Sequence, residues 1–567
     1  MILQRLCDYY DRIAADPQHR IPKIGFATQQ ISFCVVLSDN GTLQGIEDIR
    51  EFNAKTKRNL RISLPYLGTR AGQKIKPMFM WDQPKYLLGW LPKELAKQKR
   101  EIYKARLSFE ASRDLHLSFN RKIDSEGYAV LVRFYEKWNP DSMTEQQSNR
   151  LRETIGGFGV FRVVGKQYYI HDEMSVREAW SEFLKENANE KSQCLITGEF
   201  SEIADLHPVV KGVSSRSAPL VSFNDDAYTS YGKSKCFNSP VGKIASFKYT
   251  NALNYLLEPS RRRRLQIGDT TCVFWADEPS GISEDIFGMG VDLQLQEDES
   301  RAEEIVNVFK HAMQGESVLP EPGTGFHVLG LAPNAARISV RFWISGTAVE
   351  IVGRVLEHQK RLQIVGGKDD SVWISLRFIL AQTTRDPKDI QPLLGGSLLR
   401  SVLTGAPYPE SLLAAVIRRI RAEQDIRHVK AATIKAILNH NHAKEISVML
   451  DVERPEGAYQ LGRLFACLER AQEDALPGLN ATIKDRYFGA ASSTPASVFP
   501  RLIRMNQHHI GKLDGGKKVV AEKRIQEVVG RIDTFPSHFG LVDQGLFAIG
   551  YYHQRQDFFT KKDKPAE

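Results

Sequence analysis

The stretch ARISVRFWISGTAVEIVGRVLEHQKRL, residues 336–362, contains both of the periodicities that decide the fold. Residues 336–346 alternate apolar and polar side chains with a period of two, which is typical of a β-strand. Residues 347–362 change to the i, i+3, i+4 apolar spacing of an amphipathic helix. A strand that leads directly into a helix predicts mixed α and β structure in this part of the chain.

The N-terminal region shows the same mixture. Residues 1–16 have helical spacing, and ISFCVVL at 31–37 is typical of a strand. Asn40-Gly41 follows, and this dipeptide is favoured in tight hairpin turns. TTCVFWAD at 270–277 is rich in β-branched and aromatic residues, which predicts a buried strand. The chain is therefore expected to open as helix, strand, turn and strand.

The character of the sequence changes at two later places. Residues 278–304 contain nine Asp or Glu and one Arg, which indicates a loop or a boundary. From about residue 390, six segments show helical apolar spacing and are separated by Pro and Gly. The predicted fold is an α+β N-terminal body with a C-terminal all-α helical bundle. The expected division is a body at 1–385 with a possible internal boundary near 278–304, a helical connector at 386–448 and the bundle at 449–567.

Composition excludes several classes of protein. No run of about 18 apolar residues could span a membrane, and the N-terminus lacks the pattern of a signal peptide. The six cysteines, at positions 7, 34, 194, 236, 272 and 467, include no CxxC pair. A zinc site or a disulfide framework is therefore not expected, and a reducing cytoplasm fits best.

Basic residues are concentrated in one window. The net charge is +9, and residues 50–125 contain 18 Lys or Arg against 7 Asp or Glu. Lys55 to Lys76 holds seven basic residues and no acidic one. Such a segment creates a positive field that attracts phosphate backbones, although a solvated surface is the simpler interpretation of the charges alone.

Three strings imitate enzyme motifs but lack the required context. His-Asn-His at 440–442 is contiguous within a helical pattern, and no second histidine-rich segment completes a metal site with His171 and Asp172. GKLDGGK at 511–517 is followed by Lys518 where a phosphate-binding loop needs Ser or Thr, and it lies between helical segments. We expect no catalytic residues, no metal and no cofactor.

Two polar segments remain as a candidate binding surface. In YLGTRAGQKIKPMFMWDQPKYLLG, residues 66–89, a basic loop precedes Met78–Trp81, which are expected to anchor it in a core. KGVSSRSAPLVSFNDDAYTSYGKSK, residues 211–235, combines Lys, Arg, Ser, Asn and aromatic side chains. Lys and Arg can hold phosphates, while Gln, Asn and Ser can bond to base edges. The candidate nucleic-acid-binding residues are Arg70, Gln73, Lys74, Lys76, Lys211, Arg216, Ser222, Asn224 and Lys233. An alternative role for each is to cap or close a turn.

Several long strings resemble one protein family over nearly the whole chain. They are MILQRLCDYYDRI, KPMFMWDQPKYLLG, CLITGE with IADLHPVVKGV, LVSFNDDAYTSYGKS, IGDTTCVFWAD, GLAPNAARISVRFW and NATIKDRYFGAASSTPASVFPRL. They resemble the large subunit, of Cas8 type, of the type I-C CRISPR effector complex, Cascade. The segment SSRSAPL departs from the family pattern because Arg216 stands where small residues are expected, which leaves the choice of DNA motif open.

The resemblance implies a non-catalytic, cytoplasmic subunit that reads a short motif (PAM) beside the target in double-stranded DNA and helps to open the duplex. Its implied partners are target DNA, the guide RNA, the backbone and small subunits of Cascade, and a recruited helicase-nuclease. No membrane is expected. The resemblance also implies an internal start that yields a small subunit, and Met449 would give a product of 119 residues. Two alternatives stay open, namely a metal-dependent nucleic-acid enzyme and a structural assembly scaffold.

Overall fold

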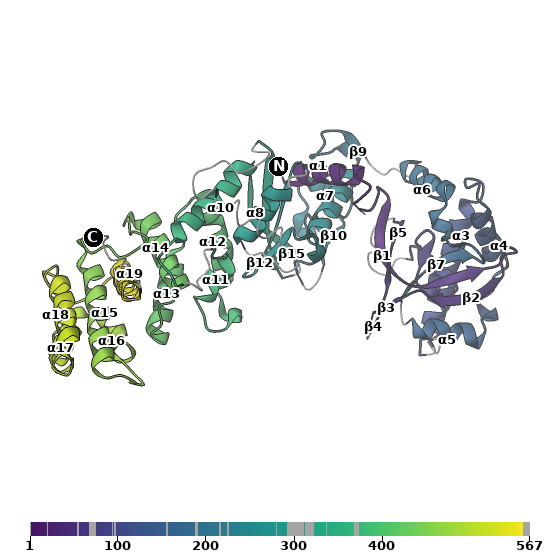
Figure 1. Cartoon of the computed structure of the whole chain (residues 1–567). Helices are drawn as coiled ribbons and strands as arrows, with labels where there is room; N and C mark the ends of the chain where they lie inside the picture. The colour runs from purple at the N-terminus through teal and green to yellow at the C-terminus, as the bar shows by residue number, and fades with distance from the viewer. Residues whose placement is uncertain are drawn as a thin grey trace. The chain divides into compact units, whose positions relative to one another are not determined.

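The structure is a computed structural model, and it describes most of the chain as two compact units (Figure 1). Unit 1 comprises Met1–Val210 and Pro219–Tyr255, and unit 2 comprises Lys211–Ala218 and Leu256–Glu567. The described residues are 2–19, 21–53, 56–66, 75–92, 94–95, 98–154, 157–186, 191–214, 217–223, 226–278, 281–291, 311, 323–335, 337–367 and 373–559.

Unit 1 begins with a helix and a five-stranded sheet. Its strands are β1 (Phe26–Leu37), β2 (Leu43–Asp48), β5 (Leu60–Pro65), β6 (Trp81–Asp82) and β7 (Phe158–Val163). The long strand β1 pairs antiparallel with β5 along its first half and with β2 along its second half, and parallel with β7. Helix α1 (Ile2–Ala15) precedes β1, and Gly41 adopts φ +82° in the turn between β1 and β2. The predicted helix, strand, turn and strand are therefore confirmed.

Helices cover this sheet and enclose an aromatic core. They are α2 (Pro84–Leu87), α3 (Lys99–Ser118), α4 (Glu126–Lys137), α5 (Glu145–Glu153) and α6 (Met174–Glu186), with short 3₁₀ turns at Pro140–Ser142 and Ile170–Asp172. Phe79 lies at the centre of the core. Its ring stacks on Trp180 at 5.1 Å and on His116 at 5.3 Å between ring centres. The core thus fixes the chain immediately after the first candidate loop.

The remainder of unit 1 consists of short elements and one longer helix. They are the hairpins β3 (Glu51–Asn53) with β4 (Thr56–Arg58) and β8 (Lys191–Gln193) with β9 (Phe200–Glu202), the strands β10 (Val209–Val210) and β11 (Ala218–Pro219), the 3₁₀ turns at Asp226–Tyr228 and Lys235–Asn238, and α7 (Lys243–Leu256). The second candidate segment therefore contains little regular structure, and its shape depends on turns and on side-chain hydrogen bonds.

Unit 2 begins with an antiparallel sheet in the order β12-β13-β14-β15. Its elements are β12 (Arg264–Ile267), β13 (Thr270–Ala276), α8 (Gly281–Val291), β14 (Gly325–Asn334) and β15 (Arg337–Thr347), after a 3₁₀ turn at Pro259–Arg261. Strand β15 runs directly into α10 (Ala348–Leu362), where Thr347 and Glu350 form a capping box. This confirms the strand-to-helix transition expected at residues 336–362.

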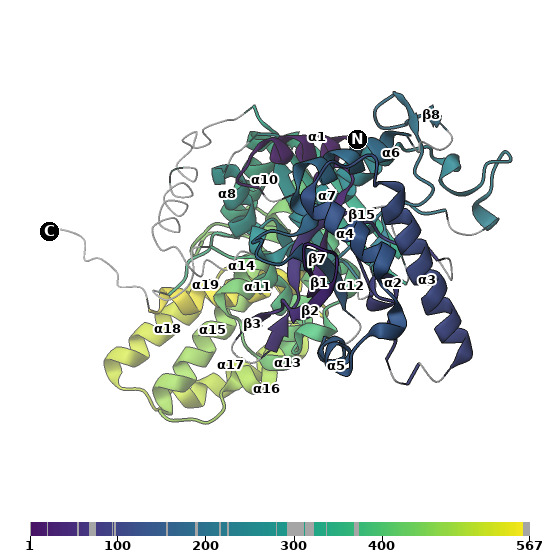
Figure 2. The same ribbon diagram turned by 90° about the vertical axis from the view of Figure 1, so that its right-hand side faces the viewer.

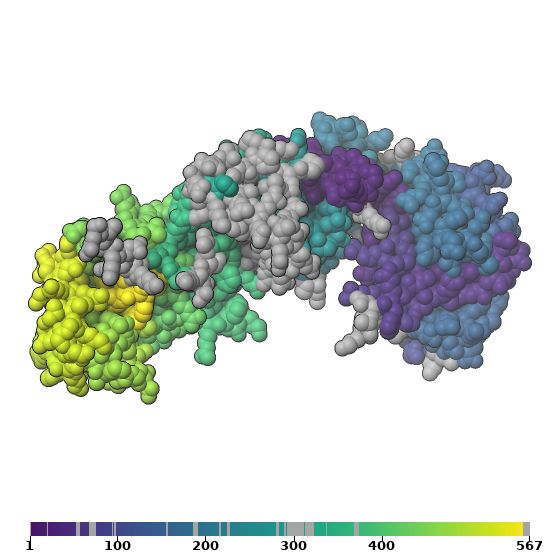
Figure 3. Space-filling view, in the orientation of Figure 1, coloured from purple at the N-terminus to yellow at the C-terminus, as the bar shows by residue number. Residues whose placement is uncertain are grey.

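The second half of unit 2 is helical. Its helices are α11 (Leu376–Ala381), α12 (Pro392–Thr404), α13 (Glu410–Glu423), α14 (His428–His442), α15 (Gly457–Ala475), α16 (Ile483–Ala491), α17 (Pro495–Ile510), α18 (Gly515–Val529) and α19 (Leu541–Asp557), with a 3₁₀ turn at Pro387–Asp389. Helices α15 to α18 lie side by side in both ribbon views (Figures 1 and 2). In the space-filling view they form one continuous body (Figure 3).

The predicted fold class is confirmed, because a mixed α/β region precedes a run of helices. One hydrophobic core extends from β12 and β13 through α10 to α19, with residues such as Phe274, Leu398 and Phe465 fully buried. Among the described helices, none has both the length and the apolar character needed to cross a membrane.

The loop expected at 278–304 is corrected in part, because its residues Gly281–Val291 form helix α8. Phe287 is buried against the sheet, and the carboxylate of Glu284 is buried with it and pairs with Arg263 at 2.5 Å. The acidic composition suggested a loop or a boundary, but Arg263, just before β12, neutralises part of that charge. The rest of the stretch up to residue 304 lies outside the described residues.

Candidate nucleic-acid interface

The first candidate loop is described only at its C-terminal end. Arg70, Gln73 and Lys74 lie outside the described residues, whereas Lys76 is described and its side chain is exposed. The four residues that follow, Met78–Trp81, are all buried. The prediction that an apolar segment anchors this loop is therefore confirmed.

Hydrogen bonds tie the two ends of this loop to a common base. The Trp81 Nε1–H donates to the carbonyl oxygen of Pro65 at 2.6 Å, which connects the residue just before the loop to the segment just after it. The fully buried carboxylate of Asp82 accepts the Met78 N–H at 2.9 Å. Because a buried carboxylate needs such donors, these bonds hold the base in one conformation. Lys76 therefore lies next to a rigid base.

A clasped hairpin, β3–β4, lies in the same basic window of the sequence. The Asp48 carboxylate accepts two bonds from the Arg50 guanidinium, at 2.8 and 2.7 Å, and one from the Lys57 ammonium at 2.8 Å. The hydrogen bonds from Arg50, with a smaller contribution from Lys57, hold the pKa of Asp48 well below its usual range. The clasp joins the end of β2 to the residue just before β3 and to strand β4.

This hairpin presents Phe52 to solvent. The side chain is 73% exposed, and Phe52 lies opposite Lys57 in the register of the two strands. An exposed aromatic ring suits stacking on a base, whereas the ammonium of Lys57 is already held by the Asp48 carboxylate. Sequence reasoning missed Phe52. The available signal was an aromatic residue next to a basic run, in a segment too short to form a core.

The second candidate segment is divided between the two units. Arg216 and Asn224 lie outside the described residues, and Lys211 is exposed in unit 2. Ser222 is half-buried in unit 1, and Lys233 is exposed there. The structure therefore places Lys76, Ser222 and Lys233 in one unit and Lys211 in the other.

Lys233 belongs to a tight turn that sequence reasoning did not identify. Ser230 and Lys233 form an antiparallel bridge, and the Lys233 N–H donates to the Ser230 carbonyl at 2.9 Å. The two central residues, Tyr231 and Gly232, have φ of +50° and +71°. Positive φ at both positions is the conformation of a type I′ turn. We name residues 230–233 the Tyr231 turn.

The segment after the Tyr231 turn fixes it to the body of unit 1. The Asn238 side chain accepts the Ser230 N–H at 3.2 Å and donates to the carbonyls of Lys233 at 2.7 Å and Lys235 at 3.1 Å. Cys236 between them is fully buried, and burial raises the pKa of its thiol. The turn is therefore built on an anchored base, like the first loop.

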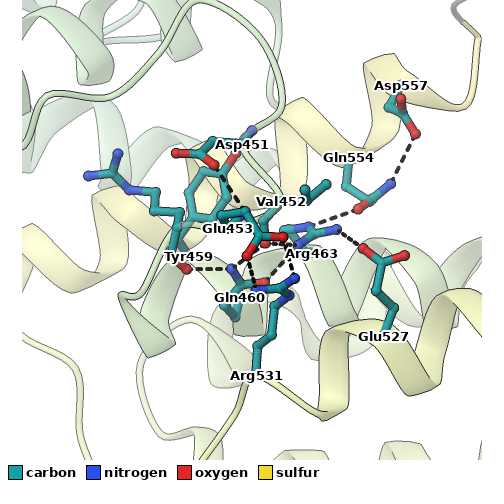
Figure 4. Close-up of polar contacts among 11 residues, drawn as sticks. Asp451, Val452, Glu453, Tyr459, Gln460, Arg463, Glu527, Arg531, Gln554 and Asp557 are labelled. Atoms are coloured by element: carbon teal, nitrogen blue, oxygen red, sulfur yellow. Dashed lines mark hydrogen bonds and ion pairs between the residues drawn. The ribbon is translucent and has the colours of Figure 1, made fainter.

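A second polar feature lies in the C-terminal helices. It includes residues that closely follow Met449, the predicted internal start of the small subunit. Arg463 of α15 is 2% exposed. Its guanidinium donates to the Gln554 Oε1 at 3.0 Å, the Val452 carbonyl at 3.1 Å and the Gln460 Oε1 at 2.9 Å, and pairs with Glu527 at 3.3 Å (Figure 4). We call these five residues the Arg463 network. It joins α15, α18 and α19 to the segment that precedes α15.

Further bonds attach that segment to the same helices. The Asp451 N–H donates to the Tyr459 hydroxyl at 3.2 Å (Figure 4). Glu453 forms two bonds with the Arg531 guanidinium, at 2.7 and 2.5 Å. Residues 451–453 are therefore held on the helical bundle by their backbone as well as by their side chains. Met449 itself lies two residues earlier and is 65% exposed.

Two of the strings that imitate enzyme motifs lie at the ends of helices. His440–His442 lie at the end of α14, as predicted, and the Asn441 side chain donates to the Tyr408 carbonyl at 2.8 Å. Gly511–Asp514 connects α17 to α18, so no strand precedes it. In the part of the chain that the structure describes, no group of three or more His, Cys, Asp or Glu could hold a metal ion.

Comparison with known proteins places the chain in a family. The profile of the family described as CRISPR-associated protein (Cas_Csd1) matches residues 6–559. No curated protein matches the chain. The match includes both candidate loops, the Tyr231 turn and the Arg463 network, and it extends over nearly the whole length. The chain therefore belongs to the Cas_Csd1 family of CRISPR-associated proteins.

Proposed function

We propose that this protein is the non-catalytic large subunit of a type I-C CRISPR surveillance complex (Cascade). In that role it reads the short flanking motif in duplex DNA, helps to open the duplex and recruits a separate helicase-nuclease. The guide RNA then reads the target by base pairing, a division of labour known from RNA-guided effectors. The observation that carries the proposal is the family match over residues 6–559.

The contacts in unit 1 support a role in binding the duplex. Lys76 is exposed at the edge of a loop whose two ends are fixed by Trp81 and Asp82. A cation on a rigid base can hold a phosphate without the entropic cost of ordering a long loop. The excess of eleven positive charges over residues 50–125 adds a long-range attraction for the backbone.

Charge reversal at Lys76 should weaken DNA binding by a similar factor for all flanking sequences. The expected reason is the loss of one phosphate contact, which also reduces the slope of log affinity against log salt by about 1. The measurement is binding of the guide-loaded complex to target duplexes with a randomised flank, at two salt concentrations. Lys76→Glu is compared with Lys388→Glu, which changes another exposed lysine, in unit 2.

Enrichment of a short flanking motif by the wild-type complex would support the proposal. Binding that ignores the flank would contradict it and favour an assembly scaffold. If the purified chain cleaved DNA with magnesium and lost that activity on mutation of a carboxylate, the metal-dependent enzyme would be favoured instead.

We also propose that an internal start at Met449 yields a 119-residue small subunit. Such a product retains Asp451, Val452 and Glu453, so the Arg463 network and the bonds of Asp451 and Glu453 to the helices stay complete. A start at Met505 would remove α15 entirely and divide α17. The bonding pattern therefore favours Met449 over Met505.

A segment of residues 449–567 should fold by itself, whereas residues 457–567 should be clearly less stable. The shorter segment lacks the Val452 carbonyl, which leaves a donor of the buried Arg463 without its acceptor, at a cost of about 1–3 kcal/mol. Thermal melts followed by far-UV circular dichroism measure the difference. A segment of residues 447–567, which adds only two exposed residues, serves as the length control and should match 449–567. Equal melting of all three segments would show that residues 449–456 do not stabilise the bundle.

A further inference from the structure

Tyr231 occupies a backbone position that its residue type does not favour. It is the first central residue of the Tyr231 turn, with φ +50°, where Asn, Asp or Gly is usual. A tyrosine with positive φ is rare because its Cβ crowds the backbone. The side chain is also 98% exposed, so it contributes almost no buried area that could offset this strain. A strained residue that does not stabilise the fold points to a function.

The turn holds the ring away from the body of the protein. Gly232 also has positive φ, and the bonds from Asn238 fix the backbone on both sides of the tip. Just after the turn, the ammonium of Lys235 pairs with the Asp205 carboxylate at 3.3 Å, which attaches the chain that follows the turn to the rest of unit 1. Because hydrogen bonds already hold the backbone of the turn, little entropy is lost when the ring binds a partner.

We propose that Tyr231 stacks on an unpaired base of DNA and that Lys233 binds an adjacent phosphate. The inference rests on the proposed function in so far as DNA is the partner of this unit. A tyrosine ring offers a flat face of the size of a base and stacks on any base regardless of sequence. Lys233 is exposed two residues away, within reach of a phosphate next to the stacked base.

The immediate surroundings favour a base over a protein side chain. Aromatic residues that anchor protein interfaces are usually surrounded by apolar contacts that exclude water. The neighbours of Tyr231 in the turn are Ser230, Gly232 and Lys233, which offer a hydroxyl, bare backbone and a cation. This set matches the sugar-phosphate backbone on either side of a stacked base. At the edge of a duplex, such a ring would hold the first separated base.

The test uses the full-length chain and three variants at one position. Tyr231→Ala removes the ring, Tyr231→Phe keeps it, and Tyr231→Asn removes it while supplying a residue that tolerates positive φ. Tyr103→Ala is the control, because Tyr103 is 64% exposed in α3 of the same unit. The probe is a fluorescein-labelled 20-nucleotide single-stranded DNA, and fluorescence anisotropy gives the dissociation constant.

Tyr231→Ala and Tyr231→Asn should both raise the dissociation constant roughly 5- to 150-fold, which corresponds to the loss of one stacked base. Tyr231→Phe and Tyr103→Ala should stay near the wild-type value. The melting temperature of Tyr231→Asn should be equal to or above that of the wild type, because the strain is relieved. A loss of affinity in that variant therefore cannot be attributed to unfolding.

Wild-type affinity of Tyr231→Ala for the single strand would overturn the stacking site. Loss of binding to the other Cascade subunits, with DNA affinity unchanged, would also overturn it and would assign Tyr231 to a protein interface. The selection of flanking motifs described above remains a separate measurement. If the wild type ignored the flank while Tyr231→Ala still weakened binding, motif reading would fail and the stacking site would stand.

Discussion

Replacing Arg463 by alanine is expected to lower the free energy of unfolding of the C-terminal helices by about 3–5 kcal/mol, through lost hydrogen bonds and a cavity in the core. The guanidinium is 2% exposed and donates to Val452, Gln460 and Gln554 (Figure 4). Alanine removes the donors to the Gln460 and Gln554 side-chain oxygens and one of the two donors to the Val452 carbonyl. It also opens a cavity the size of the lost side chain. Both effects act on the same three helices, α15, α18 and α19, so their packing should loosen together.

The same helix supplies the control for this experiment. Arg470 lies two turns after Arg463 in α15, is 35% exposed and forms an i, i+4 pair with Asp474 at 2.9 Å. Arg470→Ala should cost only about 0.3–0.5 kcal/mol, as is usual for exposed pairs of this kind. Urea unfolding followed by circular dichroism gives both values, and hydrogen exchange locates the loss. Similar values for the two variants would show that the Arg463 network does not hold the bundle together.

Arg463→Met separates the two causes of the expected loss. Methionine fills most of the volume but donates no hydrogen bonds. If its stability lies near that of Arg463→Ala, the unpaired acceptors dominate, whereas recovery of most of the stability would assign the effect to packing. Because Val452 is one of the acceptors, dominance of hydrogen bonding would also explain why residues 449–456 are needed in a separate small subunit.

Periodicity predicted the elements that bury one face. Residues 336–362 became strand β15 and helix α10, and the six C-terminal helical segments from α13 to α19 were recognised by their apolar spacing. Two helices of the same region were not identified, α12 and α16. In α12, Gly395 and Gly396 argue against a helix, since glycine disfavours helical backbone.

Tertiary packing explains why α12 forms nevertheless. A Cβ at position 395 would lie 2.8 Å from the carbonyl oxygen of Ile267, and one at 396 would lie 2.9 Å from the Thr270 side chain. The glycines therefore let the helix approach the edge of the sheet more closely than any other residue could. This gain depends on a strand more than a hundred residues away, so local propensity could not reveal it.

The sequence predicted the buried residues that anchor the candidate site, but not the exposed aromatic rings at its surface. Burial of Met78–Trp81 followed from an apolar run after a polar loop. The exposed rings of Phe52 and Tyr231 were missed, because an aromatic residue in a sequence usually indicates a core. Only the structure shows that a hairpin and a turn, each fixed by hydrogen bonds at its base, hold these rings in solvent.

Stability of unit 1 should fall steeply as the pH decreases from about 6.5 to about 4, and His116 should be a main cause. Burial lowers the pKa of His116 to about 4. Its Nε2 accepts the Met80 N–H at 2.9 Å, so Nδ1 carries the proton and donates to the Ser112 carbonyl at 2.7 Å. A second proton, on Nε2, would place an N–H donor of the ring against the Met80 N–H donor. It would also leave a charged ring stacked between Phe79 and Tyr135.

The direction of the pH dependence follows from which state binds the proton. In the unfolded chain the histidine has its ordinary pKa of about 6.5, so between pH 6.5 and 4 the unfolded state is protonated and the folded state is not. The contribution is fully present above pH 6.5 and is lost as the pH falls toward 4, by about 1.4 kcal/mol per pH unit for one proton. Burial also lowers the pKa of His171 to about 3 and of His207 to about 4 in the same unit, so the effects add.

Replacement of His116 by glutamine isolates its share of this acid sensitivity. The glutamine Oε1 can accept the Met80 N–H but cannot become charged, so the variant should be less stable than the wild type at pH 8 and should lose less stability on acidification. Urea unfolding at pH 8, 6 and 5, followed by tryptophan fluorescence, gives the slope for each protein. His538→Asn, at an exposed position of unit 2, should leave the slope of this transition unchanged. If His116→Gln also kept the wild-type slope, proton uptake by His116 would not accompany unfolding, and His171 and His207 would have to account for the acid sensitivity.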